Sequence, residues 1–330
     1  MLIVFISKKN MKAIKVIEEN LVISETPVPL PGDDEVLIKV KAAGINRADI
    51  AQRKGLYPPP AGASEILGLE CSGIIESVGK NVSARQPGDE VIALLGGGGY
   101  GEYVTCPQFH TLYKPTSLDW IEAASIPEVY ATCWLNLFME ASMKEGDKVV
   151  FHAGASGIGT AGIQLAKAFG CESFVSAGSK NKIDMCVNLG ASDGEVRSRD
   201  IFSKIKSWAP EGVDIILDPV GAEYFESNLN VLGIEGRLVI IGLMSGAQTN
   251  LNLGHLMIKR QKIIGSTIRA RNVEPKNIVM EELSQKVLPL FKSGELIPII
   301  HETYPLSESE KAHEIMEANE NIGKIILTLD

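Results

Sequence analysis

A turn of small residues between a strand and a helix carries the clearest chemical signal in the sequence. The turn is formed by Gly154, Ser156, Gly157, Ile158 and Gly159. Gly154, Ser156 and Gly159 take the three positions of a GxGxxG pattern, with serine in the second. Small residues let the backbone approach a pyrophosphate, whose charge the free amides of a helix N-terminus stabilise. We therefore predict a dinucleotide site here; the alternative is a tight structural turn.

The choice of dinucleotide depends on the end of the next strand. An NAD site usually offers an acidic side chain to the ribose at this point, but residues 176–182 contain no carboxylate. They contain Gly178, Ser179 and Lys182, which suit a 2′-phosphate. NADPH is therefore favoured over NADH, and the alternative is a solvated helix N-terminus with incidental lysines.

Cysteine and histidine spacing gives no metal or disulfide signal. The chain has five cysteines without a CxxC pair, which we interpret as buried reduced thiols: Cys71, Cys106, Cys133, Cys171 and Cys186. The five histidines show no HxxxH spacing and are interpreted as structural or solvated: His110, His152, His255, His301 and His313. No metal site is expected.

Alternating strands and helices should position the dinucleotide turn. An apolar helix is expected over residues 131–143, and five strands follow at 148–152, 172–176, 213–218, 236–241 and 262–266. This alternation predicts an α/β class, with a doubly wound parallel sheet over residues 130–276.

The sequence on either side of this α/β region predicts a second domain. Residues 11–129 are rich in β-branched residues and turn signals, which indicates a mostly β, partly open barrel. The tail, residues 277–330, is predicted to form a helix to 292, a segment at 296–300, a helix near 308–318 and a strand at 324–329. Because that tail has no sheet of its own, we expect it to return to the first domain. Met11 fits a natural start, so residues 1–10 are a candidate N-terminal extension.

Composition narrows the class of protein. The 330 residues are 45% hydrophobic and 22% charged, which is typical of a globular protein and excludes disorder and coiled coil. A net charge of −9 and a pI near 5.3 argue against nucleic-acid binding. No apolar run is long enough for a membrane helix or a signal peptide, so we expect a cytoplasmic protein with no membrane partner.

Five motifs together resemble a known family. They are AGINRAD at residues 43–49, QRKGLYPPP at 52–60, ILGLECSG at 66–73, HAGASGIG at 152–159 and NENIGKI at 319–325. These motifs are similar to those of the zinc-free, zeta-crystallin-like quinone oxidoreductases of the medium-chain dehydrogenase/reductase superfamily. The resemblance implies a discontinuous GroES-like catalytic domain, a central Rossmann domain that binds NADPH, and a cleft between the two. It also implies a homodimer paired through the edge strand near residues 262–268.

The resemblance also implies the catalytic residues. It puts Asn46 and Tyr57 beside the nicotinamide as hydrogen-bond donors; the alternatives are a turn residue before a helix and an aromatic plug. Zinc-dependent relatives place a Cys at Asn46 and a His at Leu69, and Glu70 alone would not hold zinc. Asp49 is expected to support the first turn of the following helix rather than act as a base.

Further cofactor contacts are implied at positions spread along the chain. They are Thr132, Gly242, Leu243, Met244, Ser266, Thr267, Ile268 and Asn321. Arg197 stands where relatives often carry Tyr near the 2′-phosphate, and would strengthen that contact unless residues 197–200 form a solvated loop.

These features lead to a ranked set of functions. The leading hypothesis is an NADPH-dependent, zinc-independent reductase of small quinones, working by electron or hydride transfer from the nicotinamide. The alternatives are an enone or alkenal double-bond reductase and a non-catalytic NADPH-binding sensor or structural protein. The sequence leaves the physiological quinone open.

Overall fold

The computed structural model describes residues 9–198 and 200–329, which form two compact units. Of the described residues, unit 1 comprises 9–128, 269–292 and 298–329, and unit 2 comprises 129–198, 200–268 and 293–297. The expected domain limits were residues 130 and 276; the chain passes between units at Val129 and Arg269 and returns briefly to unit 2 at Ser293–Ile297. Residues 1–8 of the candidate extension and Arg199 lie outside the described residues.

Unit 2 is built on a parallel sheet of six strands in the order β10-β9-β8-β11-β12-β13. The strands are β8 (Lys148–Phe151), β9 (Glu172–Ala177), β10 (Asp193–Val196), β11 (Val213–Asp218), β12 (Leu232–Ile240) and β13 (Lys262–Gly265). The five predicted strands and the doubly wound α/β class are confirmed. The sequence analysis missed β10, a four-residue edge strand with the polar sequence DGEV and no fully buried position.

Helices alternate with these strands along the chain. They are α3 (Pro127–Cys133), α4 (Gly157–Ala168), α5 (Lys180–Leu189), α6 (Ile201–Trp208), α7 (Phe225–Val231) and α8 (Leu253–Lys259). α4 packs against β8, β9 and α5, while α6 packs against α7. Most of α4 is buried, so its position on the sheet is fixed by apolar packing rather than by helix propensity.

The apolar helix expected over residues 131–143 is helical only as far as Glu140, and its second half is a π-helix. α3 ends at Cys133 and a π-helical segment, η2 (Trp134–Glu140), continues. The cause is the Asn136 side chain, whose Nδ2 donates to the Thr132 carbonyl at 2.7 Å, the acceptor that the Asn136 amide would use in an α-helix. The Ala141 amide then bonds the Asn136 carbonyl, a π-type step.

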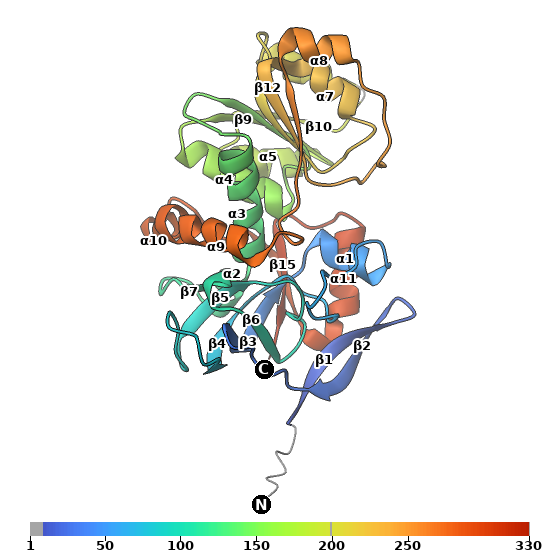
Figure 1. Ribbon diagram of the computed structural model, residues 1–330. Helices are drawn as coiled ribbons and strands as arrows, with labels where there is room; N and C mark the ends of the chain where they lie inside the picture. Colours follow the sequence, from blue (N-terminus) through green and yellow to red (C-terminus); the bar gives the residue numbers. More distant parts are fainter. Residues whose placement is uncertain (1–8, 199, 330) are drawn as a thin grey trace, which may run out of the picture. The chain divides into compact units, whose positions relative to one another are not determined.

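Unit 1 contains a seven-stranded sheet in the order β14-β15-β3-β4-β5-β7, with β6 also paired to β3, and a separate β1–β2 hairpin. The strands are β1 (Asn10–Ile17), β2 (Asn20–Pro27), β3 (Glu35–Gly44), β4 (Glu70–Val78), β5 (Glu90–Leu94), β6 (Tyr103–Pro107), β7 (Thr111–Tyr113), β14 (Ile300–Pro305) and β15 (Lys324–Thr328). In Figure 1, β15 at the red end of the chain lies beside β3 at the blue end, and the two pair antiparallel. This pairing confirms that the tail returns to the first domain.

The helices of unit 1 are short. They are α1 (Arg47–Arg53), η1 (Gln108–His110), α2 (Trp120–Ala124), α9 (Val273–Glu282), η3 (Leu283–Val287), α10 (Leu288–Ser293), η4 (Leu306–Glu308) and α11 (Ser309–Glu317). The segment at residues 296–300, to which the sequence analysis assigned no type, leads into β14, which begins at Ile300 and pairs with β15. The tail helix is also interrupted by the π-helical η3.

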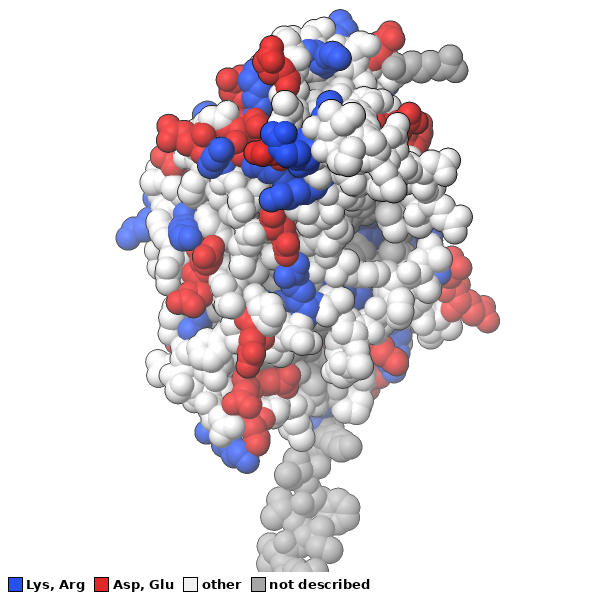
Figure 2. All heavy atoms as spheres, turned by 45° about the horizontal axis from the view of Figure 1, so that its top comes forward, with Lys and Arg blue, Asp and Glu red and all other residues white. Residues whose placement is uncertain are grey.

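The burial of the cysteines and the distribution of surface charge fit what the amino-acid composition suggests. All five cysteines are buried, as expected, and burial raises the pKa of the Cys186 thiol to about 12. Figure 2 shows acidic and basic side chains interspersed with uncharged ones over the face in view. Within the described chain, no helix has the length and apolar character needed to cross a bilayer.

Candidate functional site

The small-residue turn lies between β8 and α4, as predicted. A Cβ on Gly154 would lie 2.7 Å from the Val175 Cβ, and one on Gly159 would lie 2.3 Å from the Gly154 carbonyl oxygen. Ser156 caps α4, because its Oγ accepts the Gly159 amide at 3.1 Å. Gly157 and Ile158 open the helix. The N-terminal amides of α4, a helix of twelve residues, thus lie next to a turn whose close backbone approach only small residues allow. This arrangement fits the binding of a dinucleotide pyrophosphate.

The predicted 2′-phosphate residues gather at the end of β9. Ser179 caps α5, and Lys182 lies in the first turn of that helix. The Arg197 amide donates to the Ala177 carbonyl at 2.8 Å, and a Cβ on Gly178 would lie 3.4 Å from Arg197 Nη2. The structure thus brings Arg197 beside Gly178 and Ser179, and its side chain is exposed. The sequence could suggest this proximity only through the resemblance, since β10 was not predicted.

A buried polar chain that the sequence analysis missed links β8, β9, β11 and α7. Asn228 Nδ2 donates to Asp218 at 3.1 Å, so its Oδ1 faces His152 Nε2 at 2.8 Å. His152 Nε2 therefore carries the proton, and Nδ1 accepts from the Ser176 hydroxyl at 3.0 Å. Burial lowers the pKa of His152 to about 4 and raises that of Asp218 to about 6, so His152 is neutral at pH 7.

These hydrogen-bonded polar side chains fix the strand ends behind the turn. Asp218 also accepts the Val220 amide at 2.7 Å, which shapes the loop after β11. His152 is structural, as expected, and the signal that could have found the chain is an aspartate ending the apolar strand VDIILD.

The loops after β12 and β13 contain the next set of predicted cofactor residues. A Cβ on Gly242 would lie 2.7 Å from the Pro219 carbonyl oxygen, and the Met244 amide donates to the same oxygen. Leu243 and Met244 are more than half exposed. This loop is therefore held by backbone contacts while it presents apolar side chains outward.

The remaining predicted residues of unit 2 lie near strand and helix ends. The Ser266 amide donates to the Ile240 carbonyl, Thr267 is exposed and Ile268 is buried. Thr132 is buried in the last turn of α3.

Asn46 lies in unit 1, at the residue before α1, and its side chain is almost fully buried. Its Nδ2 donates to Glu70 Oε1 at 3.0 Å, and its Oδ1 accepts from Lys324 Nζ at 2.6 Å. Asp49 accepts the amides of Asn46 and Gly68, so it supports the start of α1 as expected. Burial raises the pKa of Asp49 to about 6, against the opposing effect of those two amides.

Tyr57 is half-buried in the loop after α1 and is held by a residue that the sequence analysis missed. Arg269 lies with its guanidinium 5.3 Å from the Tyr57 ring centre and donates to the Tyr57 carbonyl. It also donates to the Gly96 carbonyl and to Gln52. Burial raises the pKa of the Tyr57 phenol, so the hydroxyl is protonated at neutral pH and can donate a hydrogen bond.

Asn321 is the one predicted cofactor residue in unit 1. Its Nδ2 donates to the Gly323 carbonyl at 2.9 Å, within the turn that begins β15. This bond is the one expected of a strand-start turn, and the cofactor role of Asn321 stays a prediction.

Comparisons with known proteins identify the family. Residues 32–116 match the alcohol dehydrogenase GroES-like domain, and residues 157–285 match the zinc-binding dehydrogenase family. The chain is 32% identical to the quinone oxidoreductase of Homo sapiens over 332 residues, covering 98% of this chain and 99% of that protein. It belongs to the medium-chain dehydrogenase/reductase superfamily. Members of this superfamily bind a nicotinamide cofactor.

Other members of the superfamily extend the comparison. The synaptic vesicle membrane protein VAT-1 homolog of Danio rerio is 30% identical over 90% of this chain, which spans only 64% of that protein. A mycobacterial protein complexed with NADPH superposes with a TM-score of 0.87 at 26% identity, covering 97% and 100% of the two chains. The JamJ enoyl reductase gives 0.86 at 25% identity, covering 98% and 100%.

The name of the zinc-binding dehydrogenase family implies a zinc ion, which the side chains do not fit. Glu70 Oε1 is bonded to Lys324 and Asn46, and Oε2 accepts the Glu128 amide at 2.9 Å. Leu69 supplies no ligand atom. Over the described ranges, no group of three or more His, Cys, Asp and Glu side chains could hold a metal ion. The described side chains around Glu70 therefore supply no donor set for a catalytic zinc.

Proposed function

We propose that this oxidoreductase is an NADPH-dependent, zinc-independent reductase of small quinones. The observation that carries the proposal is the bonding of Glu70 and Asn46 to the ammonium of Lys324. Alcohol oxidation needs a Lewis acid to lower the alcohol pKa, and these side chains are not available to a metal. A quinone is already a strong electron acceptor, so it needs only correct position and hydrogen bonds to its carbonyl oxygen.

The preference for NADPH rests on charge at the end of β9. Lys182 and Arg197 accompany Ser179, and the segment that would carry a ribose-binding carboxylate has none. Arg197 would pair with the 2′-phosphate, and the amides of α4 would bind the pyrophosphate. When bound, NADPH supplies the reducing equivalents from its nicotinamide.

Two side chains of unit 1 would act on the acceptor. Tyr57 keeps its proton at neutral pH and is held by Arg269, so its hydroxyl can donate to a carbonyl oxygen. Asn46 has one Nδ2 hydrogen committed to Glu70, while its other contact, to the Gly44 carbonyl, is long at 3.4 Å. These donors stabilise negative charge as it develops on the acceptor oxygen.

A second candidate is the reduction of enone or alkenal double bonds. The likeness to the JamJ enoyl reductase favours it, and the same hydrogen-bond donors would serve an enone carbonyl. Quinones stay the first choice because of the higher identity to quinone oxidoreductases.

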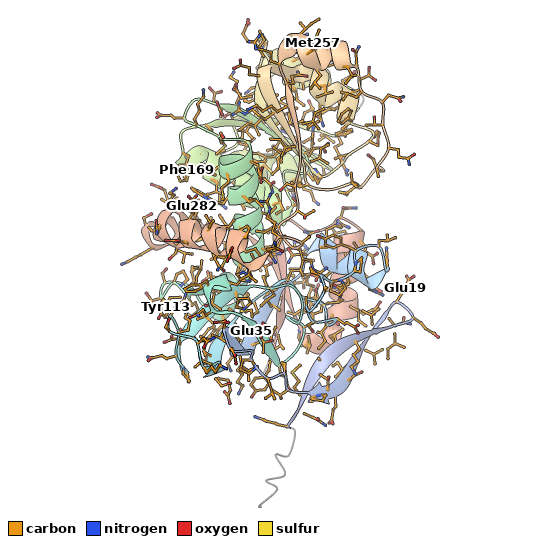
Figure 3. All side chains as sticks on the ribbon, in the orientation of Figure 1. Glu19, Glu35, Tyr113, Phe169, Met257 and Glu282 are labelled. Atoms are coloured by element: carbon orange, nitrogen blue, oxygen red, sulfur yellow. The ribbon has the colours of Figure 1, made fainter. Side chains whose placement is uncertain are left out.

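We further propose a cytoplasmic homodimer paired through β13. This strand ends the sheet of unit 2, and no other described strand pairs with its outer edge. The neighbouring helix α8 carries Met257, labelled in Figure 3, whose side chain projects from the helix and is 72% exposed. An apolar surface beside an open strand edge fits a two-fold interface.

The test is NADPH and NADH oxidation by purified protein with ortho- and para-quinones, an enone and a metal chelator. We expect chelator-insensitive NADPH oxidation with quinones that exceeds the rate with the enone. The variant Arg197→Gln should weaken NADPH binding about 10-fold and leave NADH binding unchanged. Tight NADPH binding without turnover of any acceptor would overturn the proposal, and an equal effect of Arg197→Gln on both cofactors would overturn the NADPH preference.

A further inference from the structure

A buried ammonium ion in unit 1 contacts three oxygen atoms at once. Lys324 Nζ lies 2.6 Å from Glu70 Oε1, 2.6 Å from Asn46 Oδ1 and 2.7 Å from the Ile45 carbonyl oxygen. The Lys324 residue is 4% exposed and Glu70 is fully buried. A lysine ammonium has as many protons as it has acceptors here, so its hydrogen-bonding capacity is full.

The local fold builds this contact from separate strands. Glu70 begins β4, Lys324 begins β15, and Gly44 ends β3. A Cβ on Gly44 would lie 2.3 Å from Glu70 Oε1, so glycine at this position makes room for the carboxylate. The carboxylate is held at both ends, because Oε2 accepts the Glu128 amide.

The contact fixes which way the Asn46 amide faces. Lysine donates only, so the Asn46 atom that it contacts must be the oxygen, and the nitrogen then faces the Glu70 carboxylate. Both bonds are charge-assisted, and hydrogen bonds in a chain polarise one another. The cation at the amide oxygen polarises the amide, and the Glu70 carboxylate fixes its orientation through one Nδ2 hydrogen. The remaining Nδ2 contact, to the Gly44 carbonyl, is long at 3.4 Å, so an acceptor oxygen can replace it.

We propose that Lys324 and Glu70 are positioning residues that orient and polarise the Asn46 amide for hydrogen bonding to the acceptor carbonyl. The Lys324 ammonium supplies the local positive charge in a site whose side chains do not fit zinc. This inference rests on the proposed reductase function and names the residues that prepare its donor. It does not require Lys324 to touch the substrate.

Stability alone gives a weak reason for the ion pair. Replacing a buried ion pair with uncharged residues of similar size is often neutral for folding, whereas removing one partner leaves a buried charge and destabilises strongly. A purely structural pair and a positioning pair therefore differ in the double variant, where neither charge remains.

The experiment compares Lys324→Met, Glu70→Gln and the double variant, with Lys114→Met as the matched control. Lys114 is a part-buried lysine of unit 1 that pairs with the exposed Glu90 at 3.2 Å and is remote in sequence from Asn46. Urea midpoints report folding, and steady-state kinetics with NADPH and a quinone report kcat and KM. We expect both single variants to lose stability, and the double variant to regain the wild-type midpoint. Its kcat should stay at least about 10-fold below wild type with an unchanged KM for NADPH, and Lys114→Met should keep the wild-type kcat.

Recovery of kcat together with the midpoint in the double variant would overturn the positioning role. A second readout keeps the test independent of the reductase function: side-chain amide NMR of protein labelled at asparagine, with Asn46 assigned from the Asn46→Ala variant. The two Asn46 amide hydrogens should be well separated in the wild type and approach each other in the double variant. An unchanged pair of signals would refute the inference, whereas absence of turnover in the wild type would refute only the proposed function.

Discussion

Substitution of Gly159 by alanine tests how closely α4 must approach the turn that precedes it. A Cβ at residue 159 would lie 2.3 Å from the Gly154 carbonyl oxygen and 2.5 Å from its carbonyl carbon. Both are backbone atoms that cannot rotate away, and ordinary contact needs about 3.5 Å. The start of α4 would therefore have to move about 1 Å away from the turn.

The cost follows from that displacement. Overpacking of this kind destabilises a protein by about 1–3 kcal/mol. The same movement would withdraw a helix amide from the pyrophosphate that we propose it binds. A hydrogen bond to a charged group contributes about 1.5–3 kcal/mol, so the loss of one weakens NADPH binding about 10- to 100-fold.

Two measurements check this prediction, with Gly265→Ala as control. A Cβ at Gly265 would meet no atom within 4 Å, so the same chemical change should leave folding unaltered. Urea denaturation gives the stability change, and fluorescence titration gives the NADPH dissociation constant. If Gly159→Ala matched the control in both, the close approach of α4 to the turn would not be required and our account of the site would be wrong.

Three further predictions follow from other contacts. Burial lowers the pKa of His313 from about 6.5 to about 3, so the stability that the neutral imidazole contributes is present above the unfolded pKa and is lost as pH falls. From about pH 7.5 to 5, the free energy of unfolding of the wild type should fall by about 2 kcal/mol because of this group. His313→Gln should flatten that fall, which urea denaturation measures. Arg269→Gln should release the Tyr57 loop and lower kcat/KM for the quinone about 10-fold, while NADPH binding measured by fluorescence is unchanged. A variant with the wild-type kcat/KM would contradict the role of Arg269 in holding this loop. Met257→Glu should convert the proposed dimer to monomer in analytical ultracentrifugation, whereas Leu30→Glu, at an exposed position of unit 1, should not.

The α/β repeat and the dinucleotide turn were predictable because local sequence specifies them. Short apolar strands, small residues at the turn and a capping serine are all recognised within a few consecutive residues. The π-helical segment was not predictable by periodicity, because one side chain, Asn136, takes the carbonyl that the helix would use. The edge strand β10 escaped because its polar residues lack the apolar pattern of a buried strand.

The polar contacts of the site were beyond prediction for a different reason. The Lys324 ion pair joins residues 70 and 324, and Arg269 reaches the loop of Tyr57, so each contact depends on which strand ends meet. The motif NENIGKI contains Lys324 but does not say which carboxylate the lysine meets; that follows only from the pairing of β15 with β3 and of β3 with β4.

Each unit contains a buried aspartate with a raised pKa, Asp49 in unit 1 and Asp218 in unit 2. Both side chains hold backbone amides in place rather than serve in acid–base chemistry. Asp49 in unit 1 and Asp218 in unit 2 both have a pKa of about 6 because burial penalises the ion, and both accept two backbone amides. In unit 1 the amides belong to Asn46, which precedes α1, and to Gly68, which precedes β4; in unit 2 they lie in the loop after β11. An aspartate whose oxygens are already bonded to amides cannot serve as a general base without releasing them. In the quinone reduction that we propose, Asp49 and Asp218 are therefore not the proton source, and Tyr57 or water supplies the proton. The pH profile of Tyr57→Phe is the measurement that separates those two sources: loss of a pH-dependent limb is expected if Tyr57 is the source, and an unchanged profile points to water.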